Sequence, residues 1–173
     1  MHLSVIDVPG IFQNTTAGLT TKADIALVKE MVLSYMKNPR TVMLAVVPAN
    51  VDAATQGILE MANDVDPDGD RTLGVLTKPD LVDKGAERNV LDMINGHTVK
   101  LQLGWHVVRN PGQKELEDPD TKRDDVEATF FRTTIPWSTL DASKTGVQTL
   151  KPRLTEILSG LVRREFPKVC TFE

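Results

Sequence analysis

Short apolar stretches alternate with longer amphipathic stretches along this chain. The apolar stretches lie at 3–7, 41–47, 72–76 and 105–108, and each is followed within a few residues by proline, glycine or charged residues. Apolar runs of this length that are rich in β-branched residues are typical of strands. Because 41–47 (TVMLAVV) is apolar almost throughout, we expect it to form a strand that is covered on both faces.

The amphipathic stretches between the strands predict helices. Apolar residues recur every three or four positions in 22–37, in about 52–65 and in about 86–95, which gives each stretch one apolar face. The clearest helical pattern covers 147–162, close to the carboxyl end. Strands and helices therefore alternate, and this alternation predicts a single α/β domain over 1–173 with a mostly parallel sheet and helices on both faces.

In the second half of the chain, the alternation of strands and helices is interrupted by a charged run and by prolines. The charged run 114–125 is interpreted as a surface loop that leads into a helix carrying Phe130 and Phe131. Pro152 lies inside the last helical pattern, so that helix either begins near this proline or kinks there. We expect Pro167 to end it.

The composition excludes several classes of protein. The formal charge of −4 and the pI of about 5.4 argue against a general binder of nucleic acid or membrane surfaces. The only cysteine, Cys170, cannot form an internal disulfide, which favours a reducing compartment such as the cytoplasm. No run approaches the roughly 18 apolar residues of a membrane span. The three histidines lack the spacing of metal ligands.

The candidate chemistry lies where three of the predicted strands end. The loops there read Asp7-Val8-Pro9-Gly10, Thr77-Lys78-Pro79-Asp80 and Arg109-Asn110-Pro111-Gly112-Gln113. In open α/β sheets, ligands bind at the carboxyl ends of the strands, and these loops would meet at one edge if the strands are parallel. Each loop taken alone could equally be a solvated turn, because proline, glycine and aspartate are the usual residues of turns.

Two aspartates in these loops have the chemistry for a nucleotide. The carboxylate of Asp80 can accept two parallel N–H bonds, which is what the N1–H and the exocyclic amine of guanine offer, and the stem of Lys78 can lie along the base. Asp7 can hold Mg²⁺ through a water, because Mg²⁺ prefers hard oxygen ligands and keeps part of its hydration shell.

In its motifs, the sequence resembles the GTPase domain of the dynamin superfamily, and more closely its fungal dynamin-like and Mx-like members. The segments that carry the resemblance are SVIDVPG, MKNPRTVMLAVVPAN, VDPDGDRTLGVLTKPDLVDKG and GWHVVRN, which together cover most of 3–110. The resemblance implies binding and hydrolysis of GTP, with GTP or GDP and Mg²⁺ as ligands.

The family's functional residues match several positions of this sequence. By resemblance, Asp7 would hold Mg²⁺ and the amide of Gly10 would meet the γ-phosphate. The residues that would contact the base and ribose, or support those contacts, are Thr77, Lys78, Asp80, Asp83, Arg109, Asn110 and Gln113. In paired GTPase domains the aspartate that matches Asp83 can reach the partner's nucleotide, so a second GTPase domain is an expected partner. Related proteins often read Asn-Arg-Ser-Gln where this chain has RNPGQ, which is one residue longer.

The phosphate loop of the family has no counterpart in this sequence. The pattern G-x-x-x-x-G-K-[S/T] does not occur, and by family order it would precede Leu3. Phosphoryl transfer needs such a cradle, so we expect residues 1–173 to be part of a GTPase domain, without a stalk or lipid-binding region, that alone neither binds GTP nor melts cooperatively. Membrane or cytoskeletal partners would need other regions. The alternatives are a guanine-binding or interaction module that does not hydrolyse GTP, and a doubly wound domain for an unrelated small ligand.

Overall fold

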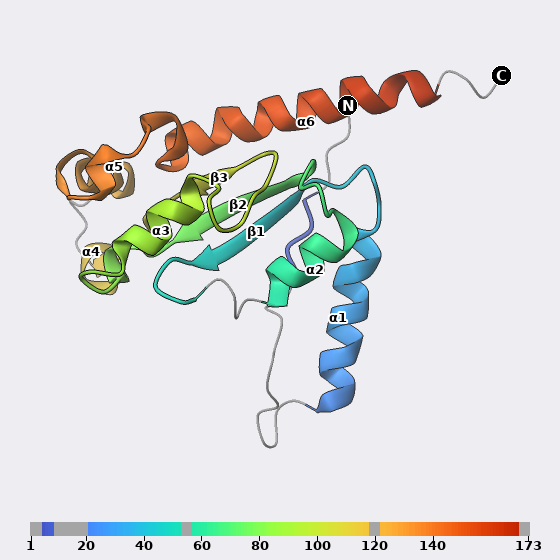
Figure 1. Cartoon of the computed structure of the whole chain (residues 1–173), viewed down its shortest axis with the longest axis horizontal. Coiled ribbons are helices and arrows are strands. Elements are labelled where there is room, and N and C mark those ends of the chain that lie inside the picture. The colour runs from blue at the N-terminus through green and yellow to red at the C-terminus, as the bar shows by residue number, and fades with distance from the viewer. Residues whose placement is uncertain (1–4, 9–20, 53–56, 118–121, 170–173) are drawn as a thin grey trace.

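The computed structural model describes residues 5–8, 21–52, 57–117 and 122–169. Its sheet has three parallel strands in the order β1 (Met43–Pro48), β2 (Thr72–Thr77) and β3 (Trp105–Val107). The helices are α1 (Lys22–Met36), α2 (Gly57–Val65), α3 (Glu87–Ile94), α4 (Gln113–Glu117), α5 (Arg123–Thr133) and α6 (Val147–Val169) (Figure 1). Short 3-10 helices occupy Pro79–Leu81, Trp137–Thr139 and Ala142–Lys144. The predicted α/β fold with a parallel sheet is confirmed.

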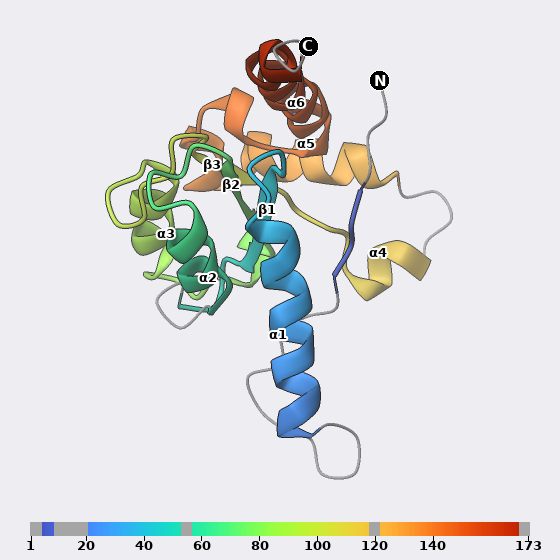
Figure 2. The same cartoon turned by 90° about the vertical axis from the view of Figure 1, so that its right-hand side faces the viewer.

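The strand register sorts the sheet's side chains onto two faces. Val47 pairs with Leu76 and lies with it in the cluster that α3 covers, because paired residues of parallel strands point to the same side. On the other face, Leu73 and Val75 pack with Leu150 at the start of α6. Figure 2 shows α6 on one side of the sheet and α2 and α3 on the other. Helices therefore cover both faces of β2, whose first five residues are buried.

Position 74, in the middle of β2, has room only for glycine because of Trp105 on β3. Trp105 pairs with Gly74, and its indole occupies the space that a side chain at position 74 would need. A Cβ at position 74 would come within 2.3 Å of the ring, far inside van der Waals contact. The indole N–H donates to the carbonyl of Val99 at 2.9 Å, so this large, fully buried side chain also has its polar atom satisfied.

β1 differs from the prediction because one of its faces is open. Its residues alternate between buried and exposed, and Leu44 and Val46 are 42 % and 52 % exposed. They pair with Leu73 and Val75, so they lie on the same face as α6. Residues of α6 pack in that cluster against β2 and against Leu103 and Val108, which flank β3, and the cluster does not include β1. The prediction of a strand covered on both faces is therefore wrong for the residues that the structure describes.

The strand predicted at 3–7 is also not formed in its described part. Residues 5–8 have no regular secondary structure, and Val5 is 86 % exposed. A strand needs a neighbour to pair its N–H and C=O groups, and none of the described segments pairs with 5–8. Val8 instead packs at the margin of the cluster formed by α1, β1 and α2.

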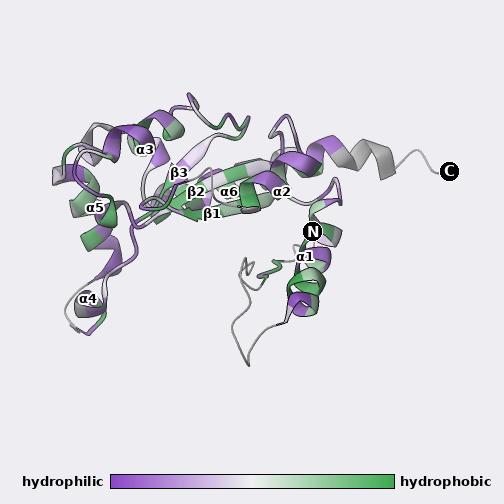
Figure 3. Ribbon diagram, turned by 60° about the horizontal axis from the view of Figure 1, so that its bottom comes forward, coloured by the Kyte–Doolittle hydropathy of each residue, from purple (hydrophilic) through white to green (hydrophobic). Residues whose placement is uncertain are grey.

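The helices follow their sequence patterns closely. Thr21 caps α1, with reciprocal hydrogen bonds between Thr21 and Asp24. Only Val32 and Met36 of α1 are buried, and Figure 2 shows the helix projecting from the sheet. Figure 3 shows β1 and β2 mostly in the colour of apolar residues, whereas the helices carry both colours. Among the helices that the structure describes, none has the length and apolar composition that crossing a bilayer requires.

α6 corrects the expectation that Pro167 ends the last helix, and its start lies before Pro152. The helix begins at Val147, runs through Pro152 and continues past Pro167 to Val169. A proline in a helix leaves the carbonyl four residues earlier without its partner. Gln148 and Arg163, which carry those carbonyls, are exposed, so water can take the place of the missing N–H. The charged run at 114–125, predicted to be a surface loop, includes most of the short helix α4 and the start of α5.

Candidate functional site

The loop after β2 is a tight turn that presents Asp80. Lys78 has a φ of 56°, in the left-handed region, and Pro79–Leu81 then forms a 3-10 turn. A residue with a side chain in the left-handed region costs about 1–3 kcal/mol, and such residues concentrate at functional sites. Pro79 is buried beneath the turn, while Lys78 and Asp80 are exposed at the edge of the sheet. The carbonyl of Thr77 accepts a hydrogen bond from the N–H of Ala49, which fixes the end of β2 against β1.

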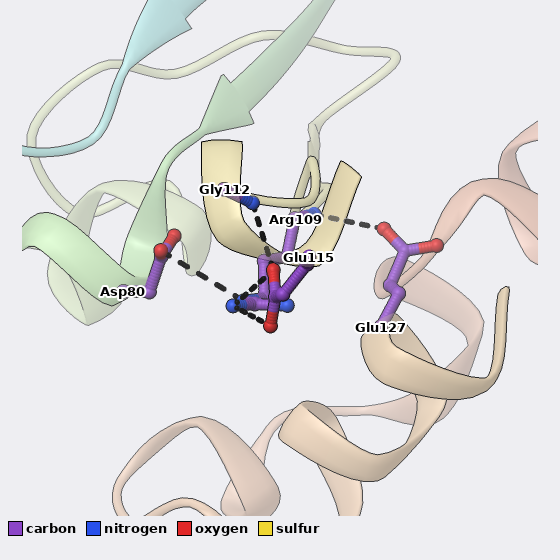
Figure 4. A network of polar contacts seen from close by, with 5 residues as sticks. All are labelled: Asp80, Arg109, Gly112, Glu115 and Glu127. Atoms are coloured by element: carbon purple, nitrogen blue, oxygen red, sulfur yellow. Dashed lines mark hydrogen bonds and ion pairs between the residues drawn. The ribbon is translucent and has the colours of Figure 1, made fainter. Parts of the chain in front are cut away.

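The loop after β3 brings Arg109 to the same edge of the sheet. Its Nε lies 3.8 Å from Oδ2 of Asp80, and its Nη2 donates to both oxygens of Glu115 at 2.9 and 3.0 Å. The main-chain N–H of Arg109 donates to Oε1 of Glu127 at 2.8 Å. Figure 4 shows Arg109 between Asp80 and the two glutamates. The structure thus places the predicted residues Asp80 and Arg109 side by side, although they are distant in the sequence.

The guanidinium of Arg109 is held on several sides. Only 12 % of the side chain is exposed, and its Cζ lies 5.5 Å from the centre of the Phe130 ring, within the range of a cation–π contact. Glu115 also accepts the N–H of Gly112 at 2.7 Å. The hydrogen bonds from Arg109, and then that from Gly112, hold the pKa of Glu115 below its usual value. The carboxylate of Glu115 therefore remains charged near neutral pH.

Two further predicted residues lie in this loop without meeting Asp80. Oδ1 of Asn110 accepts a hydrogen bond from Nη2 of Arg123 at 3.1 Å, so Asn110 is tied to the start of α5. Gln113 begins α4 and donates to Glu117 at 2.9 Å along that helix. Their contacts stabilise the loop, and neither residue has a hydrogen bond or ion pair with Asp80.

The remaining predicted residues are not joined to this cluster. Asp7 is exposed and makes no hydrogen bond or ion pair with another residue that the structure describes. Gly10 lies outside the described residues. Asp83 is exposed beyond the 3-10 turn, and its carbonyl accepts the N–H of Ala86. In the described ranges no group of three or more His, Cys, Asp or Glu side chains is arranged to hold a metal ion.

Sequence reasoning missed three residues of the site: Glu115, Glu127 and Phe130. Glu115 belongs to the charged run that the sequence predicts to be a surface loop, yet both of its carboxylate oxygens accept hydrogen bonds from Nη2 of Arg109. Glu127 is 3 % exposed and accepts the N–H groups of both Arg109 and Val147. The sequence did contain a signal for Glu127. It precedes Phe130 by three residues and Phe131 by four, so it lies on the same face of the helix as these apolar side chains.

Comparison with known proteins agrees with the motifs. Residues 1–79 match the model of the dynamin family, and residues 89–171 match the model of the dynamin central region. Three similar proteins are the interferon-induced GTP-binding proteins Mx of Epinephelus coioides, Mx of Perca fluviatilis and Mx1 of Mus musculus.

The similarity to these relatives covers most of this chain. Identity is 38 % over 171 residues, 41 % over 140 and 40 % over 169, respectively, which is 96 %, 80 % and 95 % of this chain. The matched regions make up 27 %, 46 % and 26 % of those proteins, so the chain spans between about a quarter and a half of their length. The chain belongs to the dynamin superfamily of large GTPases and is similar to its Mx members.

Proposed function

We propose that this chain supplies the guanine-recognising part of a dynamin-superfamily GTPase. The observation that carries the proposal is the meeting of Asp80 and Arg109, 3.8 Å apart, where β2 and β3 end. Their loops are the two in which the sequence predicts base contacts, and ligands of α/β sheets bind at this edge. The similar Mx proteins of Epinephelus coioides and Mus musculus are named GTP-binding proteins, which supports the same ligand.

Each residue of the loop after β2 has a role in this proposal. The carboxylate of Asp80 accepts the N1–H and the 2-amino group of guanine, and adenine has no matching pair of donors. The aliphatic part of Lys78 lies along the base, and Thr77 supports the loop from the end of β2. Asp83, Asn110 and Gln113 are the candidates for contacts with the ribose or with a second GTPase domain.

Asp7 and Gly10 are proposed to act at the phosphate end of the nucleotide. Asp7 has an exposed carboxylate, which suits a metal ion held through water, and it is the residue that would bind Mg²⁺. The bound ion would neutralise charge on the phosphates, and the amide of Gly10 would donate to the γ-phosphate. Hydrolysis is proposed for the protein in which these residues act together with a phosphate loop.

Removing the carboxylate of Asp80 tests the proposal. We expect the longest natural chain that carries residues 1–173 to bind a fluorescent GTP analogue in a titration. Asp80→Ala should weaken binding roughly 10- to 100-fold, because it removes two hydrogen bonds to a charged acceptor. Asp68→Ala, at an exposed turn at the opposite end of β2, is the matched control and should bind like the wild type. Unchanged affinity after Asp80→Ala would contradict guanine recognition by this loop.

A further inference from the structure

Contacts to both the backbone and the side chain of Arg109 fix its position. Glu127 from α5 holds its main-chain N–H, and Glu115 from α4 holds its guanidinium with two hydrogen bonds. The ring of Phe130 lies beside the guanidinium on a third side. Because two helices and an aromatic ring fix both its backbone and its side chain, Arg109 has little freedom to move away from Asp80.

The same arginine retains unused donors beside Asp80. Nε and Nη1 are buried and form no hydrogen bond within the described part of the chain, and Nε is the atom that lies 3.8 Å from Oδ2 of Asp80. This separation is too long for a hydrogen bond but short enough for a strong attraction between partly buried charges. Asp80 is therefore drawn toward a fixed positive charge, while 27 % of its side chain remains accessible.

We propose that Arg109 is a positioning residue that orients the carboxylate of Asp80, and that it thereby sets the preference for a base with a 2-amino group. This inference rests on the function proposed above and extends it to a residue that does not itself touch the base. Guanine presents two parallel N–H donors, and a carboxylate can accept both only when its plane is aligned with the base.

The attraction of Oδ2 to Arg109 restrains that plane. The last side-chain torsion of aspartate is broad, so an unrestrained carboxylate would sample many orientations. Each carboxylate oxygen has two acceptor sites, so Oδ2 can face Arg109 and still accept a hydrogen bond from the base. Loss of Arg109 should therefore weaken mainly the hydrogen bond that the 2-amino group of guanine donates to Asp80.

The experiment compares GTP with inosine triphosphate, which lacks only the 2-amino group. In the longest natural chain that carries residues 1–173, the wild type should bind GTP about tenfold or more tightly than inosine triphosphate, as expected for one hydrogen bond to a charged acceptor. Arg109→Gln should reduce this ratio to about threefold or less, mainly by weakening GTP. Arg109→Lys keeps the charge and should restore part of the ratio.

Two more variants separate orientation from general damage. Glu115→Gln weakens the hold on the guanidinium and should lower the ratio in the same direction by a smaller factor. Arg132→Gln, on the exposed side of α5, is the matched control and should leave the ratio unchanged. Circular dichroism of each variant reports whether the fold is retained.

Several outcomes would overturn the inference. Equal weakening of both nucleotides in Arg109→Gln would make the arginine a general support of the loop. Tighter binding of both would make it an obstruction over Asp80, and an unchanged ratio would remove it from the site. A wild-type protein that binds no GTP would overturn the proposed function and this inference together, whereas binding with an unchanged ratio overturns the inference alone.

Discussion

At the scale of single residues, two buried carboxylates hold the backbone around them in place. Asp66 accepts the N–H groups of Asp70 and Arg71 and lies 2.5 Å from the hydroxyl of Thr72, which fixes the turn before β2. Glu127 does the same at the other end of the sheet, between the loop after β3 and the start of α6. Because a buried carboxylate is costly without hydrogen bonds, each of these acids specifies the arrangement of the backbone around it.

Replacing Glu127 should therefore destabilise the protein. Glu127→Ala leaves the N–H groups of Arg109 and Val147 without their acceptor, and we expect a loss of about 2–4 kcal/mol in the free energy of unfolding. Urea unfolding followed by tryptophan emission measures it, because both tryptophans are buried. Glu30→Ala, an exposed acid on α1, is the control and should change stability by less than about 0.5 kcal/mol. Equal stability of the two variants would contradict the role of Glu127.

At the scale of elements, hydrogen bonds join β3 to the start of α6. The main-chain N–H of Gly146 donates to the carbonyl of Val107 at 2.8 Å, and Nε2 of His106 lies 2.8 Å from the carbonyl of Gly146. Arg153 donates to the carbonyl of Trp105 at 3.1 Å and also contacts that of Leu103. His106 is fully buried among these groups, and its burial lowers its pKa. The junction between strand and helix thus contains a histidine that favours the neutral form.

This junction should weaken in mild acid. The unfolded state takes up a proton near the ordinary histidine pKa of about 6.5, whereas folded His106 resists it until a lower pH. Stability should therefore fall as the pH drops below about 6.5, by at most about 1.4 kcal/mol per pH unit for this one group. Arg153, whose positive charge lies beside the ring, acts in the same direction, and Glu127 opposes it.

The measurement is the urea midpoint of tryptophan emission at pH 7.5 and at pH 5.5. The wild type should have the lower midpoint at pH 5.5, and His106→Gln should lose much of this difference. His97→Gln, whose side chain is 68 % exposed, is the matched control and should keep it. If the urea midpoint of the wild type is no lower at pH 5.5 than at pH 7.5, His106 does not contribute.

The sequence predicted the elements better than the contacts between them. The three strands of the sheet appear within about two residues of their apolar runs, because turn residues delimit those runs. The run at 3–7 has the same appearance but no neighbouring strand among the described residues, and pairing cannot be read from a single segment. Asp80 and Arg109 were found because strand ends are recognisable. Glu127 was missed as a site residue because its partners are main-chain N–H groups, which no sequence motif marks. Glu115 was missed because only the fold shows that it lies beside the guanidinium of Arg109.

At the scale of the whole molecule, apolar surface is distributed unevenly. Leu44 and Val46 lie exposed on β1, while Leu73 and Val75, their partners in register on β2, are 0 % and 3 % exposed beneath α6. Figure 3 shows this apolar colour on β1 as well as on β2. Strand residues with equal hydrophobicity thus differ in what they contribute to stability, since only those removed from water gain free energy.

Paired substitutions on the two strands should separate these contributions. In the longest natural chain that carries residues 1–173, Leu44→Ser with Val46→Thr should change the free energy of unfolding by less than about 1 kcal/mol and reduce binding of the dye ANS, because exposed apolar surface is lost. The same changes at Leu73 and Val75 should cost several kcal/mol, since they place polar groups in the α6 cluster. Urea unfolding and ANS fluorescence measure both effects. Equal destabilisation by the two pairs would mean that the α6 face of β1 is covered in solution as fully as that of β2.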